Sequence, residues 1–190
     1  MANSKIIVVE GAQGAGKTTI TDFIRNTIPY TNLYRLNGTA DSSPTGLAKS
    51  KKMYWGLVEY IRTLENASIN LLFDRTFFTE EIYCRLGFKE YSFTETFNQL
   101  LDELSKMDFD IYYITLYLSD ERAFERRLDR PDKAKTKYAK FNLESSVTQQ
   151  NAYLALADEI EKKYPNIHVV KIDNLQPLEK TENCIRELLS

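Results

Sequence analysis

Cysteine and histidine are scarce in this sequence of 190 residues, which contains two cysteines and a single histidine. Cys84 and Cys184 show neither the spacing of a metal site nor that of a disulfide framework, so both are expected to be reduced thiols. His168 falls inside an expected strand at residues 167–172, where a structural role is favoured. Chemistry based on a histidine triad or on a cysteine-held metal is therefore not expected.

Long apolar runs are also missing, and the net charge is only −2. No run approaches the roughly 20 apolar residues that cross a bilayer, and the first residues lead into an expected strand without a signal-like segment. A net charge this small gives no global field that draws the protein to nucleic acid. We expect a cytosolic protein in which residues 1–190 form one domain, without a membrane partner and with nucleic acid disfavoured as a partner.

Basic residues are nevertheless concentrated in one segment. Residues 122–140 contain eight of them, namely Arg122, Arg126, Arg127, Arg130, Lys133, Lys135, Lys137 and Lys140. A local basic patch on an acidic protein favours a small polyanion as its target.

Residues 10–19 read Glu-Gly-Ala-Gln-Gly-Ala-Gly-Lys-Thr-Thr and contain the phosphate-binding pattern G-x-x-x-x-G-K-[ST] without a mismatch. The small residues at 14–16 allow successive backbone N–H groups to curl around a phosphate at the start of the following helix. Lys17 would reach the β- and γ-phosphates of ATP, and the Thr18 hydroxyl would be a ligand of Mg²⁺. The expected ATP-binding residues of this loop are Gly11, Gln13, Gly14, Ala15, Gly16, Lys17, Thr18 and Thr19.

The flanks of this loop supply the context that the pattern requires. Residues 6–9 are a continuous run of β-branched apolar residues, typical of a strand that is covered on both faces. Ile20, Ile24 and Ile28 then recur at helical spacing until Pro29 ends the helix. A glycine-rich turn that binds nothing is the alternative, and the strand before the loop and the helix after it argue against that alternative.

Strand and helix patterns alternate to the end of the chain, which predicts parallel strands joined by helical crossovers. Further strands are expected at residues 32–36, 69–73, 111–118 and 167–172. Further helices are expected at 47–64, in the segment after Arg75 that runs through Tyr83, and at 93–106, 120–130, 143–164 and 177–189. The predicted fold class is α/β, a three-layer P-loop NTPase fold with a five-stranded parallel sheet, helices on both faces and a basic lid at about residues 126–142.

Two charged residues, Asp74 and Arg75, follow directly after the expected strand at 69–73. The carboxyl ends of strands are where open α/β sheets bind ligands. We expect Asp74 to organise Mg²⁺ together with Thr18, and Arg75 to grip a phosphate through two hydrogen bonds. The alternative is that Asp74 and Arg75 pair with each other or cap the next helix.

Arg126 and Arg130 are four residues apart on an expected helix and therefore share one of its faces. A catalytic interpretation is a lid that folds over the triphosphate and neutralises charge on the transferred group. A hydrated basic helix surface is the alternative.

Aromatic residues are plentiful, with 12 Tyr and 10 Phe. Several flank the expected site in sequence, namely Tyr54, Trp55, Phe77, Phe78 and Tyr83. Rings of this kind can enclose a nucleobase, although a place in the core is favoured for most of them. Trp55 and Tyr83 are the two that we expect to contact the acceptor.

With these residues in place, the chain resembles the thymidylate kinase group of P-loop nucleoside and nucleotide kinases. The matching motifs are Glu10-Gly11 with residues 14–19, Asp74-Arg75 with Thr79 and Tyr83, residues 123–126 continuing to Arg130, residues 153–157, and Ile172-Asp173. The resemblance implies that Arg75 holds the acceptor phosphate, that Arg126 and Arg130 serve the lid, and that Asp173 and Asn174 border adenine. It also implies ATP and Mg²⁺ as cofactors, a dTMP-like acceptor and a homodimer.

Two segments depart from the pattern of that family. Gln13 stands where thymidylate kinases usually have Asp, and residues 35–39 stand where they carry R-E-P-G-G-T, so that Arg35 is kept as an expected acceptor contact. A nucleoside kinase needs a carboxylate here to take a proton from the sugar hydroxyl, whereas a monophosphate is already anionic. Leu36 therefore favours a monophosphate as the acceptor.

The sequence predicts an ATP-dependent kinase that acts on a (deoxy)nucleoside monophosphate. One alternative is a deoxynucleoside kinase that uses Asp41 or Glu10 as its base. Two others are a kinase for a modified or polymeric nucleic acid and a nucleotide-binding switch without an acceptor.

Overall fold

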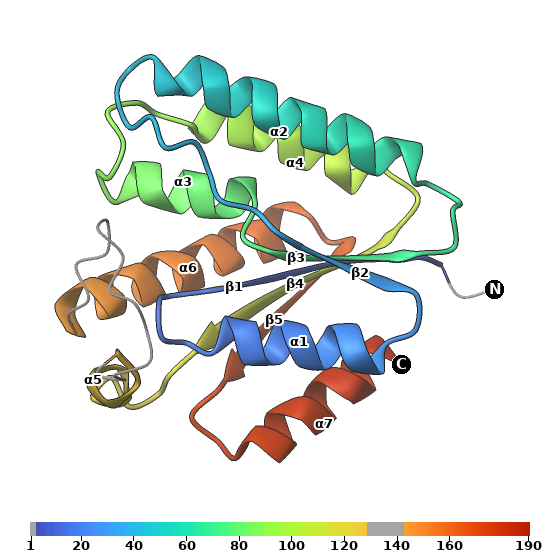
Figure 1. Ribbon diagram of the computed structural model, residues 1–190, viewed down its shortest axis with the longest axis vertical. Helices are drawn as coiled ribbons and strands as arrows, with labels where there is room; N and C mark the ends of the chain where they lie inside the picture. Colours follow the sequence, from blue (N-terminus) through green and yellow to red (C-terminus); the bar gives the residue numbers. More distant parts are fainter. Residues whose placement is uncertain (1–2, 129–142) are drawn as a thin grey trace.

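A parallel sheet lies at the centre of the computed structural model, which describes residues 3–128 and 143–190. Its strand order is β2-β3-β1-β4-β5, and each neighbouring pair is parallel. The strands are β1 (Lys5–Gly11), β2 (Thr31–Arg35), β3 (Asn70–Asp74), β4 (Asp110–Tyr117) and β5 (Ile167–Asp173). The predicted five-stranded parallel sheet is confirmed (Figure 1).

Helices cover both faces of this sheet, as predicted. On one face lie α1 (Lys17–Thr27) and α7 (Leu178–Leu189) (Figure 1). On the other lie α2 (Gly46–Thr63), α3 (Phe77–Arg85), α4 (Thr94–Ser105) and α6 (Leu143–Lys163). None of the described helices combines the length and the apolar character that a transmembrane span requires.

Strand β1 is buried on both faces, because its side chains alternate between two cores. Ile6 and Val8 pack with residues of α2, α3, α4 and α6, whereas Ile7 and Val9 pack with residues of α1 and α7. All four side chains are almost completely inaccessible to solvent. Burial of each contributes about 1.5–3 kcal/mol, so the strand provides a firm base for the loop that follows Gly11.

The strand register brings the polar residues of the expected site to one edge of the sheet. Asp74 lies opposite Val9 of β1 on one side and opposite Arg35 of β2 on the other. After β5, the backbone N–H of Asn174 donates a hydrogen bond to the carbonyl of Tyr117 at 2.8 Å. The carboxyl ends of the strands therefore gather residues that are far apart in the sequence.

The predicted lid is only partly described by the structure. Helix α5 (Ala123–Leu128) begins three residues after the start of the predicted helix at 120–130, whose last two residues lie outside the described part of the chain. It begins after a turn in which the backbone N–H of Ala123 donates to the Asp120 carbonyl at 3.0 Å. Arg130 and the rest of the lid up to residue 142 lie outside the described residues.

Candidate functional site

The loop between β1 and α1 has a backbone that only glycine adopts without strain. Gly11, Gly14 and Gly16 have φ angles of 150°, 89° and 99°. A Cβ atom added to Gly16 would lie 2.4 Å from the side-chain nitrogen of Asn174, and one added to Gly11 would lie 2.7 Å from the carbonyl oxygen of Leu116. The glycines of the pattern thus permit both the turn and its close packing.

Positive charge is concentrated where this loop enters α1. The Lys17 side chain is largely buried, and its Nζ donates to the carbonyl oxygens of Gly11 at 2.6 Å and Ala12 at 3.1 Å. The first turn of α1 contains no acidic residue, and no side chain caps the helix. Its free N–H groups and Lys17 together favour a bound anion.

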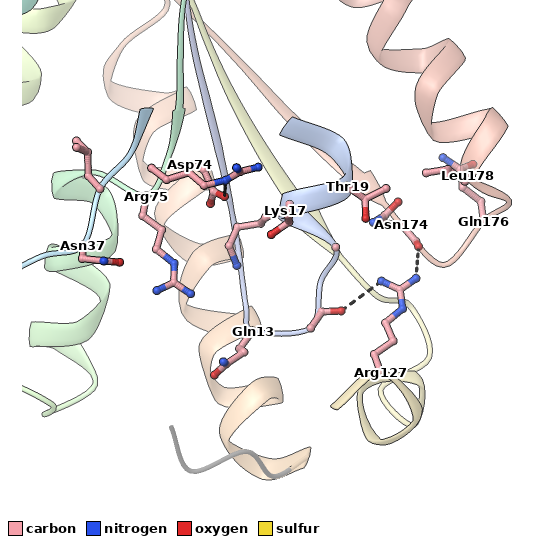
Figure 2. A pocket seen from close by; sticks show the side chains of 15 residues that line it. Gln13, Lys17, Thr19, Asn37, Asp74, Arg75, Arg127, Asn174, Gln176 and Leu178 are labelled. Carbon is pink, nitrogen blue, oxygen red and sulfur yellow. Dashed lines mark hydrogen bonds and ion pairs between the residues drawn. The ribbon is translucent and has the colours of Figure 1, made fainter. Parts of the chain in front are cut away.

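A cavity of about 530 Å³ opens in front of the loop, and we call it the phosphate cavity (Figure 2). Its size is within the range of about 300–1,000 Å³ that is usual for small-molecule sites. Its lining residues are Gln13, Gly14, Gly16, Lys17, Thr18, Thr19, Arg35, Leu36, Asn37, Asp74, Arg75, Arg127, Asn174, Gln176 and Leu178. Most of the predicted ATP-binding residues are among them.

Asp74 offers an oxygen that no other described group uses. Its Oδ2 accepts a hydrogen bond from Arg35 Nε at 3.3 Å, while Oδ1 is buried without a hydrogen-bond partner. Thr18 lines the same cavity. Mg²⁺ in nucleotide enzymes is usually held by one or two protein oxygens together with phosphates and waters, so Asp74 and Thr18 fit such an ion.

A second, smaller cavity of about 120 Å³ adjoins the first, and we call it the base pocket. Its lining residues are Asn37, Gly38, Thr39, Tyr54, Arg75, Thr79, Glu80, Tyr83 and Lys89. Asn37 and Arg75 line both cavities, and Figure 2 shows the Arg75 side chain between Asn37 and Lys17. One arginine therefore faces both spaces.

The backbone of Arg75 is strained, with φ of 70° in a residue other than glycine. Such a conformation costs about 1–3 kcal/mol and is often found at functional sites. It follows directly on Asp74 at the end of β3, so the turn sets the positions of both side chains.

Arg127 ties the loop to the end of β5. Its NH1 donates to the carbonyl oxygens of Gly14 at 3.3 Å and Ala15 at 3.2 Å, and its NH2 donates to that of Asn174 at 2.7 Å (Figure 2). The Asn174 side chain also donates to Ala15 O at 2.8 Å. Asn174, which the family resemblance places beside adenine, thus lines the phosphate cavity together with Arg127.

Arg127, which was not among the site residues predicted from the sequence, lines the phosphate cavity, and its predicted neighbour Arg126 does not. The Arg126 side chain is 73% exposed and lies 3.8 Å from Asp120, and it does not line the phosphate cavity. Helical periodicity is the sequence feature that indicates Arg127, because Ala123 and Phe124 are the buried positions of α5. Arg127 is four residues after Ala123 and three after Phe124, so it neighbours both buried positions, whereas Arg126 is at such a spacing from Ala123 alone.

Four other predicted contacts do not line either cavity. Asp173 Oδ1 accepts from the backbone N–H groups of Ser119 at 3.2 Å and Leu175 at 3.1 Å, and only its neighbour Asn174 lines the phosphate cavity. Trp55 is half-buried against the core, while the adjacent Tyr54 lines the base pocket. Gly11 and Ala15 shape the loop without lining the cavity.

The two carboxylates proposed as bases for a nucleoside kinase line neither cavity. Glu10 is fully buried and accepts hydrogen bonds from Thr79 Oγ1 at 2.9 and 3.1 Å. Burial raises the pKa of Glu10 to about 7, against the opposing attraction of Lys17.

Asp41, the second of these carboxylates, is occupied by neighbours in its own loop. It accepts hydrogen bonds from Lys49 Nζ at 2.5 Å and from Ser43 Oγ and Thr45 Oγ1 at 2.6 and 2.8 Å. The bond from Lys49, followed by those from the two hydroxyls, holds the pKa of Asp41 well below its usual range. Neither Glu10 nor Asp41 is placed to take a proton from a ligand in these cavities.

No protein-family model matches the sequence, and comparison with curated proteins gives no match. Solved structures do match. Thymidylate kinase from Candida albicans has 15% sequence identity and a TM-score of 0.70, over 100% of this chain and 92% of that chain. The chain has the fold of the P-loop nucleotide kinases.

Two further structures with the nucleotide kinase fold show the same likeness. Deoxyadenosine kinase from M. mycoides, solved with dCMP and dCDP, has 18% identity and a TM-score of 0.58 over 97% of each chain. The YorR protein from Bacillus subtilis, solved with phosphorylated GDP, has 15% identity and a TM-score of 0.64 over 97% of this chain and 95% of that chain. The predicted resemblance to the thymidylate kinase group is confirmed at the level of the fold.

Proposed function

We propose that this protein transfers the γ-phosphoryl group of ATP to a (deoxy)nucleoside monophosphate. The observation that carries the proposal is the position of Arg75, which lines both the phosphate cavity and the base pocket. A guanidinium group at the junction can hold the phosphate of an acceptor whose base lies in the smaller space.

The triphosphate is assigned to the phosphate cavity, against the loop at residues 11–18. Backbone N–H groups and Lys17 would bind its oxygens, and the buried Oδ1 of Asp74 with Thr18 would hold Mg²⁺. The ion supplies charge neutralisation for the phosphates when it is bound. Arg127 and Asn174 keep the loop in place from the β5 side.

Transfer then requires little more than alignment and charge stabilisation. An oxygen of the acceptor phosphate, held by Arg75, attacks the γ-phosphorus. A bond forms between that oxygen and phosphorus, the bond from phosphorus to the β-γ bridging oxygen breaks, and ADP leaves with the electron pair. Lys17, whose Nζ lies at the loop against the Gly11 carbonyl, would stabilise the charge on the transferred group.

A monophosphate is preferred to a nucleoside because a nucleoside hydroxyl must lose a proton to a base. Glu10 is sealed in the core and Asp41 is occupied by three side chains, as described above. An anionic phosphate oxygen needs neither of them. The resemblance to thymidylate kinases adds dTMP as a first acceptor to try.

Labelled ATP offered with a panel of acceptors tests the proposal. We expect label from the γ-phosphate to appear in a nucleoside diphosphate when deoxynucleoside monophosphates are supplied. Label in a nucleoside monophosphate would show that a nucleoside is the acceptor, and label at the end of a DNA oligonucleotide would show that DNA is the acceptor. Either result would contradict the proposal. Release of inorganic phosphate alone, with every acceptor unlabelled, would indicate a nucleotide-binding switch.

A further inference from the structure

The base pocket has an acidic wall that the proposed transfer reaction does not use. Glu80 is 2% exposed, and its Oε1 accepts hydrogen bonds from Ser50 Oγ at 3.1 Å and from the Tyr91 hydroxyl. Among the described residues, none donates a hydrogen bond to its Oε2. A Cβ on Gly38, which lines the pocket, would lie 2.5 Å from that oxygen, so Oε2 faces the pocket side of Glu80.

A buried cation lies beside this carboxylate. The Lys89 side chain is 8% exposed, and its Nζ lies 3.8 Å from Glu80 Oε1. The same Nζ donates to the Thr39 carbonyl at 2.6 Å, which uses one of its three N–H groups. Lys89 also lines the base pocket. The pocket therefore presents an acceptor oxygen and a donor nitrogen close to each other.

The size of the pocket restricts what can bind there. Its volume of about 120 Å³ is below the range of about 300–1,000 Å³ that suits a drug-sized ligand. It suits one ring system rather than a whole nucleotide. The remainder of the ligand would extend past Asn37 and Arg75, which the base pocket shares with the phosphate cavity.

We propose that the base pocket selects acceptors whose base carries an exocyclic amino group, and that Glu80 Oε2 and Lys89 Nζ are the selecting atoms. An ionised carboxylate only accepts hydrogen bonds, and an ammonium group only donates them. Cytosine, adenine and guanine place an amino donor next to a ring position or carbonyl that accepts. This inference rests on the proposed function and names its class of acceptor.

Thymine and uracil carry a carbonyl oxygen, O4, where cytosine carries its amino group. In the pose that places the cytosine amino group against Glu80 Oε2, that carbonyl oxygen would meet the carboxylate, and two acceptors would face each other. Leaving a buried polar group without its partner costs about 1–3 kcal/mol, which corresponds to about 5- to 150-fold in kcat/KM. The chain's own residues thus point away from the dTMP-like acceptor that the family resemblance implies.

A comparison of dCMP with dUMP tests the inference, because the two acceptors differ by an amino group against a carbonyl. With saturating ATP, we expect kcat/KM for dCMP to exceed that for dUMP by about 5- to 150-fold. The best of dCMP, dAMP and dGMP should exceed dTMP by a similar factor. Equal or better use of dUMP or dTMP would overturn the inference and leave the proposed kinase function intact. Failure of every monophosphate to accept label would instead overturn the proposed function.

Glu80→Gln supplies the second arm, because an amide can donate to a carbonyl where the carboxylate cannot. We expect this variant to lose about 5- to 150-fold in kcat/KM for dCMP, to keep or raise its value for dUMP, and so to lose most of the preference. Glu59→Gln is the matched control, since the Glu59 side chain is 64% exposed on α2 and lines neither cavity. Its preference should equal that of the parent protein.

Binding measurements keep the test valid if Glu80→Gln turns over slowly. Calorimetric titration of the folded variant, checked by its circular dichroism and melting temperature, should show weaker binding of dCMP and unchanged or tighter binding of dUMP. An unchanged ratio of the two dissociation constants would show that Glu80 does not select the base.

Discussion

Replacing Arg127 by alanine should weaken ATP binding, because Arg127 holds the phosphate loop from outside. It donates at 2.7 Å to the Asn174 carbonyl and at 3.2 and 3.3 Å to those of Ala15 and Gly14. A hydrogen bond from a charged group contributes about 1.5–3 kcal/mol. Because two of the three bonds are long, we expect the three together to contribute about 2–3 kcal/mol. Their loss should raise the dissociation constant of ATP by about 30- to 150-fold.

The matched control for this prediction is Arg126→Ala on the same helix. Its side chain is 73% exposed with a 3.8 Å separation from Asp120, and exposed pairs of this kind contribute about 0–1 kcal/mol. Calorimetric titration with Mg²⁺-ATP should therefore give Arg126→Ala a dissociation constant within a few-fold of the parent. The reverse order, with Arg126→Ala the weaker binder and Arg127→Ala unaffected, would refute the reasoning and support the lid role that the sequence assigned to Arg126.

Three further predictions concern the loop and the carboxylates beside it. Lys17→Ala should lower kcat by a factor of hundreds, since comparable electrostatic contacts contribute about 2.7–4 kcal/mol; steady-state kinetics measure this. Asp74→Asn should raise the Mg²⁺ concentration for half-maximal activity by about 10- to 100-fold, as a magnesium titration would show. The parent protein should lose folding stability as the pH rises from about 4.5 to 7, because the raised pKa of Glu10 means that the folded protein keeps a proton which the unfolded chain releases. Glu10→Gln should remove this loss.

Each of these predictions has a result that would contradict it. Near-normal turnover by Lys17→Ala would exclude its role on the transferred group, and an unchanged magnesium requirement in Asp74→Asn would exclude that carboxylate as a ligand. For Glu10 the expected effect is on the order of 3 kcal/mol. Urea unfolding of the parent and variant with parallel pH profiles would show that Glu10 does not titrate as described.

The sheet and its phosphate loop were predictable because their causes are local in the sequence. A run of β-branched residues at 6–9 can be recognised without any tertiary information. The glycines at 11, 14 and 16 likewise mark a backbone that other residues do not adopt easily. The structure confirms the five-stranded parallel sheet and the layers that these patterns predict.

The base pocket was harder to predict because its walls come from separate elements. On α2, the fully buried Tyr54 lines the pocket while the half-buried Trp55 does not, and one residue along a helix is a rotation of about 100°. Glu80 lies on α3 and Lys89 in the loop after it, and charged residues are usually exposed. Only the tertiary structure shows that these two side chains are buried together.

In the proposed reaction, the phosphate cavity holds the triphosphate and the base pocket holds the acceptor base, with Arg75 between them. The most direct measurement is a crystal structure with a non-hydrolysable ATP analogue, Mg²⁺ and dCMP. We predict the β- and γ-phosphates within the loop at residues 11–18 and against Lys17, and the acceptor phosphate against Arg75. A triphosphate bound elsewhere, or an acceptor phosphate that does not contact Arg75, would contradict the account.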